Sequence, residues 1–366
     1  MSFANIARAA RGCIGPRRRW SGLAAFIALA GARASACDIC SVYTPTDVVY
    51  TTTEMREDQI GIYAGLAEQF TAFRTLKRNG ETVANPAGER LNSSISQLVL
   101  GYDFHPRVGV QLNVPIIARW FRRVTEDGVE NGDVSGFGDL SLVLTGKPFS
   151  WRSVDSVAHA TVLGGLKLPS GDPDEIGEEV EPDRCIPFPD PTACLQRVHV
   201  PNHLHPHHQN GAPSGIHGHD LALGSGSVDG IVGAQVFGSW RRLFATASVQ
   251  YAIRGTGAFD YRYADDLTFD AGPGLYLLTG PDWLGAPYAL RAQVLFAGET
   301  KGTDSIDGQR VGDTGFTGLY LGPAIGFAWG TRLSAGFAAE LPVLTHTTGL
   351  QIVPEYRLLG AFTWRF

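Results

Sequence analysis

Histidines are concentrated in one stretch of this 366-residue chain, residues 169–220. Seven of the ten histidines lie there, and Asp220 ends the stretch: His199, His203, His205, His207, His208, His217 and His219. Imidazole nitrogens bind Cu²⁺ and Zn²⁺, and short histidine-rich tracts commonly bind metal. The stretch therefore predicts a site that gathers copper or zinc, although the protein needs no cofactor for its fold. The alternative is a solvated polar loop whose histidines meet metal only adventitiously.

Two pairs of cysteines could also do chemistry. Cys185 and Cys194 lie within the same stretch, whereas Cys37 and Cys40 form a C-x-x-C motif near the N-terminus. A disulfide is the first interpretation for each pair if the protein is exported to an oxidising compartment. Ligation of a soft metal by the thiols is the alternative.

The sequence motifs give little support for an enzyme. The chain has no nucleophile elbow in a Ser-His-Asp order, no P-loop, no H-E-x-x-H and no Rossmann fingerprint. Its formal net charge of −6 argues against a nucleic-acid partner. We therefore expect a protein that is not an enzyme, with a barrel hydrolase as a minor alternative.

An export signal is expected at the N-terminus. Arginines crowd residues 8–19, an apolar run covers about 23–30, and Ala34-Ser35-Ala36 forms an A-x-A cleavage site. This order is typical of a cleaved secretory signal, and the apolar run is shorter than the roughly 20 residues of a membrane-spanning helix. We predict a signal peptide at 1–36 and a periplasmic N-terminal segment at 37–56. Lipidation of Cys37 is a minor alternative, because Ala34 stands where a lipobox usually has Leu.

Apolar and polar residues alternate along most of the remaining chain. In 107–122, for example, Val110, Leu112 and Val114 alternate with Gln111 and Asn113. Because successive side chains of a strand point to opposite faces, each such segment has one apolar and one polar face. Twelve segments fit this pattern: 59–77, 93–104, 107–122, 137–147, 154–168, 225–238, 243–254, 268–278, 288–299, 315–329, 332–341 and 349–366.

The connections between these segments alternate in length. Those after the second, fourth, sixth, eighth and tenth segments are short, and those after the first, third, fifth, seventh and ninth are longer and polar. Short periplasmic turns and long external loops are typical of bacterial outer-membrane barrels. We predict an all-β, up-and-down antiparallel transmembrane β-barrel of about 12 strands over 57–366, with 169–220 as a His-rich external loop. A soluble all-β protein is the alternative.

Charged residues on the polar faces of these segments are candidates for lining the lumen. They are Asp139, Lys147, Asp229, Arg254, Arg291, Glu340 and Arg357, with Gln293 beside them. A barrel of this size lies between the filled and the open, porin-like cases, so we expect a narrow or partly plugged channel. Alternatively, these groups only neutralise one another inside the barrel.

Three motifs resemble one family of proteins. They are G-F-G-D-L at 136–140, G-L-K-L-P-S-G-D at 165–172 and G-S-G-S-V-D at 224–229. Their order and strand context resemble the outer-membrane transporters linked to the meta pathway of phenol degradation. The resemblance implies a barrel that passes small molecules. The connection between the second and third motifs is much longer than this family leads one to expect, so phenol itself does not carry over.

The last strand predicts the partners of the barrel. Residues 356–366 alternate and end on Phe366, and they resemble the closing strand of outer-membrane barrels, which the assembly machinery recognises. We expect outer-membrane lipid and that machinery as partners, and a channel or transporter for a small solute as the function. The alternatives are a non-transporting surface barrel that displays or senses metal, and an importer of small aromatic or hydrophobic compounds.

Overall fold

The computed structural model describes residues 60–125, 128–179, 184–187, 194–198 and 214–366. The predicted signal peptide and N-terminal segment, with Cys37 and Cys40, lie outside these residues. So do five of the histidines predicted to bind metal: His199, His203, His205, His207 and His208.

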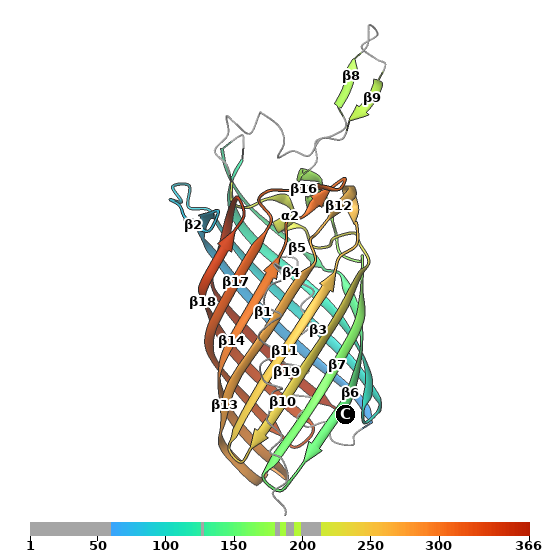
Figure 1. Cartoon of the computed structure of the whole chain (residues 1–366), viewed down its shortest axis with the longest axis vertical. Coiled ribbons are helices and arrows are strands. Elements are labelled where there is room, and N and C mark those ends of the chain that lie inside the picture. Colours follow the sequence, from blue (N-terminus) through green and yellow to red (C-terminus); the bar gives the residue numbers. More distant parts are fainter. Residues whose placement is uncertain (1–59, 126–127, 180–183, 188–193, 199–213) are drawn as a thin grey trace, which may run out of the picture. The chain divides into compact units, whose positions relative to one another are not determined.

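Twelve long strands form a closed antiparallel barrel, which confirms the predicted fold class (Figure 1). Neighbours along the chain pair in sequence, and β19 returns to pair with β1, so the wall has no free edge. Each strand overlaps one of the predicted segments. They are β1 (Gly61–Arg78), β3 (Arg90–His105), β4 (Val108–Thr125), β6 (Leu140–Arg152), β7 (Ser156–Leu168), β10 (Asp229–Trp240), β11 (Leu243–Ile253), β13 (Asp266–Trp283), β14 (Ala286–Lys301), β17 (Phe316–Trp329), β18 (Leu333–Thr347) and β19 (Leu350–Arg365).

The barrel buries polar side chains and exposes apolar ones. On β4, Gln111, Asn113 and Arg119 are almost fully buried, whereas Ile116 and Trp120 are 40% and 48% exposed. A protein in water would do the opposite, because exposed apolar surface is unfavourable there. In lipid the arrangement is stable, because the apolar side chains face hydrocarbon and the polar side chains face the lumen. The backbone groups of neighbouring strands bond to one another within the wall. The wall is therefore that of a transmembrane barrel.

The two rims of the barrel differ. Turns of two or three residues join β3 to β4, β6 to β7, β10 to β11, β13 to β14 and β17 to β18 at one rim, here called the short-turn rim. The longer connections lie at the other, the long-loop rim, where β2 (Glu81–Thr82), β12 (Tyr261–Arg262), β15 (Ser305–Ile306) and β16 (Gln309–Arg310) form (Figure 1). None of the helices in the described residues is long and apolar enough to cross a membrane.

Two predicted loops contain structure. Residues 125–134 were expected to be a loop, but most of them form β5 (Gly128–Phe137), which pairs with β4 and extends the wall. The stretch 169–220 contains the 3-10 helix η1 (Asp174–Glu179), the paired strands β8 (Arg184–Pro187) and β9 (Cys194–Val198), and most of the short helix α2 (Gly218–Leu221). The prediction of a connection without a strand at 125–134 was therefore wrong. The sequence of β5 hides its strand pattern, because polar residues interrupt both of its faces and it has no apolar row facing lipid.

A charged residue on the lipid face tests this orientation. Val236 lies near the middle of β10 and is 49% exposed. We expect Val236→Arg to reduce the free energy of unfolding in a bilayer by about 2–4 kcal/mol, because it places a cation in hydrocarbon. Val154→Arg, in a fully exposed turn, is the control and should change stability little. The free energy of unfolding is measured by urea titration of the barrel in lipid vesicles. Equal losses for the two substitutions would contradict the conclusion that Val236 faces lipid.

Candidate functional site

The three motifs predicted from the sequence meet at one point of the lumen, at the long-loop rim. Gly138, Gly171 and Gly224 lie so close that a Cβ on Gly171 would approach the backbones of the other two to 2.9 Å. Side chains are excluded at this crossing. The motifs therefore fix where the strands β6, β7 and β10 meet the chain that enters from the loop.

A chain of buried charges runs from this crossing. The Nζ atom of Lys167 lies 2.5 Å from Asp139 Oδ2 and 2.9 Å from Asp229 Oδ2. Arg254 continues the chain, with Nη1 3.0 Å from the same Asp229 oxygen and a second ion pair to Asp266. Every one of these side chains is less than a tenth exposed. Opposite charges alternate, so no charge is buried without a partner.

A second charged cluster lies on the opposite wall. Arg357 of β19 pairs with Glu299, lies 3.6 Å from Glu340, and stacks with its guanidinium 3.9 Å from the ring centre of Tyr320. Tyr320 donates its hydroxyl proton to Glu299 Oε1. These groups come from four strands, β14, β17, β18 and β19, which they tie together inside the lumen.

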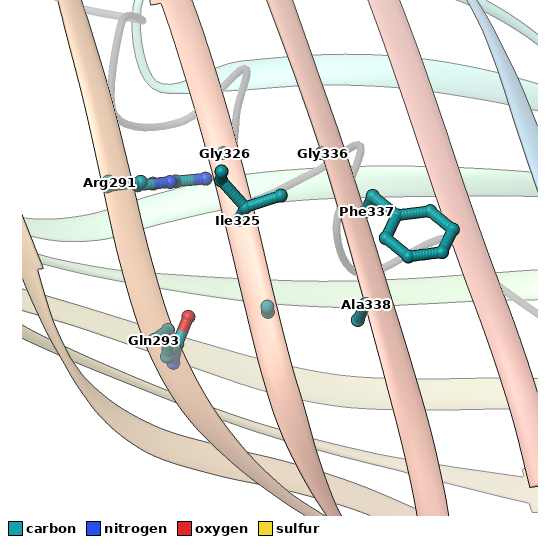
Figure 2. Close-up of a pocket in the computed structure, with 8 residues that line it drawn as sticks. Arg291, Gln293, Ile325, Gly326, Gly336, Phe337 and Ala338 are labelled. Carbon is teal, nitrogen blue, oxygen red and sulfur yellow. The ribbon is translucent and has the colours of Figure 1, made fainter.

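A small cavity lies among residues of β14, β17 and β18. Arg291 and Gln293 of β14 line it together with Gly326 and Ala338 (Figure 2). Ala324 is also among the lining residues. The cavity between them measures about 30 Å³, which is the volume of about one water molecule. The remaining predicted lumen residue, Lys147, is buried near the short-turn rim.

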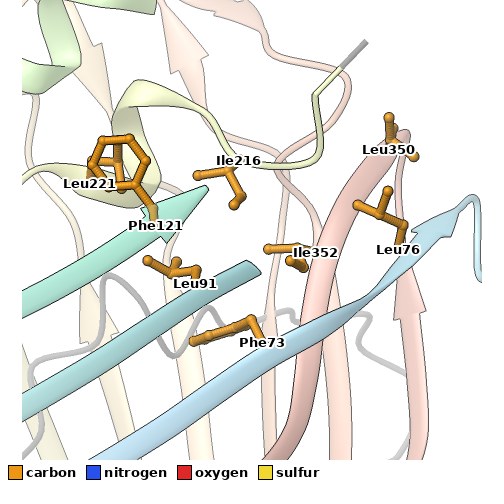
Figure 3. Packing of buried hydrophobic residues seen from close by; sticks show 8 residues of the cluster. All are labelled: Phe73, Leu76, Leu91, Phe121, Ile216, Leu221, Leu350 and Ile352. Carbon is orange, nitrogen blue, oxygen red and sulfur yellow. The ribbon is translucent and has the colours of Figure 1, made fainter. Parts of the chain in front are cut away.

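A folded segment closes the long-loop rim. Residues 214–224, which contain α2, and η1 form what we call the cap. Its Ile216 and Leu221 are fully buried and pack on inward-facing apolar residues of the wall (Figure 3). These residues form an apolar patch on β1, β3, β4 and β19: Phe73, Leu76, Leu91, Phe121, Leu350 and Ile352. The Arg119 guanidinium also donates to the Ala222 carbonyl at 2.5 Å, which fixes the cap to β4.

The cap brings together three of the residues predicted to bind metal. Donor atoms of His217, His219 and Asp220 all lie within 4.8 Å of one another. His219 Nδ1 lies 2.9 Å from Glu179 Oε1, and its Nε2 lies 3.3 Å from Asp220 Oδ1. Burial lowers the pKa of His219, but the carboxylates of Asp220 and Glu179 outweigh burial and raise it well above its usual value. Burial raises the pKa of Glu179, but His219 more than reverses this and brings it to about 2.

The wall has an opening in its hydrogen-bond ladder beside the apolar patch. Strands β18 and β19 pair from Leu333 and Trp364 up to Glu340 and Arg357, and there the pairing ends. Residues 341–347 of β18 and 350–356 of β19 continue as strands without pairing to each other, although both are fully described. We call this opening the β18–β19 seam. Lys77 of β1 reaches across it and donates to the Thr345 carbonyl at 3.0 Å.

Irregular backbone accounts for the seam. Pro342 and Pro354 lie on its two sides, and proline cannot donate a ladder hydrogen bond. The register also shifts near both prolines, between Leu319 and Tyr320 opposite β18 and between Ala72 and Phe73 opposite β19. Such bulges bend a strand away from its neighbour. The paired register therefore ends at Glu340 and Arg357, and the Ile352 N–H donates to the Gly215 carbonyl of the cap at 2.9 Å.

The sequence missed several of these features. Lys167 lies in a recognised motif, and its spacing from Asp229 on neighbouring strands could have revealed the ion pair. Glu179, Arg119 and the seam depend on contacts between distant segments, which no local pattern shows. Cys185 and Cys194 lie on the paired strands β8 and β9, where they align with Arg197 and Pro187 and not with each other. Their predicted disulfide stays a prediction.

Comparisons with known proteins were informative only for structure. No protein-family model matches the chain, and no curated protein matches it. Among solved structures, it is similar to the COG4313 outer-membrane channel from Pseudomonas putida F1. The TM-score is 0.53 and the identity 14%, over 84% of this chain and 96% of that one. The chain has the fold of a bacterial outer-membrane β-barrel.

Other outer-membrane channels resemble this barrel less. They include the CymD monoaromatic hydrocarbon channel, with a TM-score of 0.35 and 9% identity over 91% of this chain and 98% of that one. A Pseudomonas aeruginosa FadL homologue has a TM-score of 0.34 and 9% identity, over 90% and 96% of the two chains. The predicted link to the meta pathway of phenol degradation stays a prediction.

The Lys167 ion pairs can be tested by a double-mutant cycle. Lys167→Met leaves Asp139 buried without its cation, so we expect it to reduce the free energy of unfolding by about 3–5 kcal/mol. Adding Asp139→Asn removes the unpaired charge and should recover much of that loss. Urea unfolding of the vesicle-inserted barrel measures both. If the losses of unfolding free energy caused by Lys167→Met and by Asp139→Asn simply add in the double variant, the ion pair does not stabilise the barrel.

Proposed function

We propose that the chain is an outer-membrane channel that admits small, largely apolar solutes, aromatic compounds among them. In this account the long-loop rim faces the outside, and the solute leaves the lumen through the β18–β19 seam. The seam is the single observation that carries the proposal. The predicted signal peptide would bring the chain to this membrane.

The energetics of a membrane wall support a functional seam. Backbone groups that lack partners in hydrocarbon destabilise a barrel by several kcal/mol each, so bacterial barrels close their ladders. Here the ladder is open over residues 341–347 of β18, where Leu341 and Val343 are 60% and 58% exposed on the outer face. An apolar solute could pass between such side chains without meeting water. A polar solute would be excluded, because it would lose its hydration there.

The apolar patch supports the same class of solute. Leu350 and Ile352 belong to both the patch and the seam, so the patch leads directly to the opening. It is now covered by Ile216 and Leu221 of the cap. A solute with an apolar ring or chain could replace these two side chains when the cap moves. The charged clusters and the narrow cavity below make the route straight down the lumen less favourable for such a solute.

Restoring the ladder tests the lateral route. The double substitution Pro342→Val and Pro354→Val returns two backbone donors to the seam. We expect uptake of a small aromatic solute, such as toluene, into lipid vesicles to fall at least about tenfold. The reason is that a closed ladder leaves no gap for the solute. Single-channel ion conductance should stay unchanged.

Pro273→Val is the matched control, because Pro273 lies on β13 in a paired part of the wall. Its uptake should equal that of the unmodified protein. Unchanged uptake in the double variant would contradict lateral passage. If the unmodified barrel passes no solute at all, a surface barrel that only displays its loop is the better account.

The cap should control access from the outside. Ile216→Ser together with Leu221→Ser removes the apolar contacts that hold the cap on the patch, where each buried side chain contributes about 1.5–3 kcal/mol. We expect a higher and noisier ion conductance in planar bilayers. Val228→Ser, at an exposed apolar residue just before β10, is the control. Identical traces for all three proteins would exclude the cap as a barrier.

A further inference from the structure

Two imidazoles and three carboxylates meet inside the cap. Besides the contacts of His219 with Glu179 and Asp220, His217 Nδ1 lies 3.7 Å from Asp220 Oδ2 and His217 Nε2 lies 3.3 Å from Asp313 Oδ2. The two rings stack with their centres 5.4 Å apart. The five residues come from η1, from the segment around α2 and from the connection between β16 and β17.

Both rings contact carboxylates through both of their nitrogens. Each imidazole turns one nitrogen toward an outer carboxylate, Glu179 for His219 and Asp313 for His217. Each turns its other nitrogen toward Asp220, which lies between them. Ligating histidines in proteins almost always hold their second nitrogen against a carboxylate, a carbonyl or water, which fixes the ring and its tautomer. The cap thus has both the ligands and the groups that orient them.

One donor atom in this cluster lacks a partner. His217 Nδ1 is buried and makes no hydrogen bond. Buried polar atoms are rarely left in this state, because the loss of hydration is not repaid. The backbone N–H of His217 donates to Asp220 Oδ2 at 3.0 Å, so this hydrogen bond does not use Asp220 Oδ1. An ion between His217 Nδ1, His219 Nε2 and Asp220 Oδ1 would give His217 Nδ1 a partner and would replace the 3.3 Å contact between the other two atoms.

We propose that His217, His219 and Asp220 bind one divalent transition-metal ion, Zn²⁺ being the best fit, and that this ion holds the cap closed. Two histidines and a carboxylate leave the fourth tetrahedral position open for water. Donor atoms up to 4.8 Å apart must approach one another by up to about 1.4 Å, because the ligands of a tetrahedral Zn²⁺ lie about 3.4 Å apart. Three carboxylates around two imidazoles also favour a dication over a neutral occupant.

The ion would act on the same cap that the proposed function treats as a barrier, so its effect on transport rests on that function. His217 follows the anchor Ile216, and Asp220 precedes the anchor Leu221. Metal binding would make the segment between the anchors rigid and tie it, through Glu179 and Asp313, to η1 and to the loop before β17. Solute entry would then decrease when the metal is present.

The competing explanation is a set of ion pairs without metal. Protonated His219 between Glu179 and Asp220 would account for two of the contacts. The five histidines at 199–208 would bind metal adventitiously as well. The test therefore starts from a reference variant in which His199, His203, His205, His207 and His208 are Ala and Cys185 and Cys194 are Ser.

The reference variant, purified as a folded barrel in detergent, is titrated with Zn²⁺ and with Co²⁺, whose visible absorption reports a tetrahedral site. We expect one tightly bound ion per chain. His217→Ala should lower the affinity at least about 100-fold, and Asp313→Asn by about 10–100-fold, as for other groups that orient ligands. His105→Asn, in an exposed turn, should change nothing. Heat-modifiable migration on a gel checks that each variant is folded.

Hydrogen exchange gives a second readout that does not depend on transport. Zn²⁺ should slow amide exchange in residues 216–224 of the reference variant and not in His217→Ala. No bound ion in the reference variant, or equal affinity in His217→Ala, would overturn the site. Binding with unchanged exchange would overturn the lock. The lateral route through the seam is untouched by either result, because the proline variants test it without metal.

Discussion

One buried cation fixes the point where the chain leaves the cap and enters the wall. Lys167 lies between Asp139 and Asp229, at the crossing where three glycines let the incoming loop touch the wall. With its ammonium buried, both carboxylates must stay close, and this brings the starts of β6 and β10 to the end of β7. Ser225 joins the same cluster through hydrogen bonds to Asp139, so the chain leaving the cap is held there as well. The cap is therefore attached by electrostatics at one end and by the apolar patch at the other.

The same physics explains why the seam is exceptional. A membrane wall has lipid outside and a polar lumen inside, and neither supplies hydrogen bonds to a gap in the hydrocarbon layer. Because β1 pairs with β19, the backbone groups of the wall have hydrogen-bond partners almost everywhere. The Arg357 cluster ties four strands together just below the seam. Above that cluster Lys77 donates to the Thr345 carbonyl, and the Ile352 N–H of β19 donates to the Gly215 carbonyl of the cap at 2.9 Å. The strong cluster thus lets the strands above separate without loss of the barrel.

The barrel could be predicted from the sequence because its signal is local. Alternation on β4 or β10 is visible in a few residues, and the lengths of the turns distinguish the two rims. Strand β5 was missed because it carries no apolar row. The cap was missed for a different reason: Ile216 and Leu221 look like isolated residues in a polar loop until the distant wall patch is known. His219 was named as a metal ligand, but its partner Glu179 lies forty positions away in a segment taken for a loop.

The central claim is that the wall opens sideways between β18 and β19. Spin labels at Val343 and Glu355, both exposed on the outer side of the seam, report the separation of the two strands. Labels at Phe337 and Phe362, on the paired part of the same strands, provide the reference. The account predicts that toluene widens or broadens the distance distribution of the first pair and leaves that of the second unchanged. A first pair as narrow and as insensitive to solute as the second would contradict it.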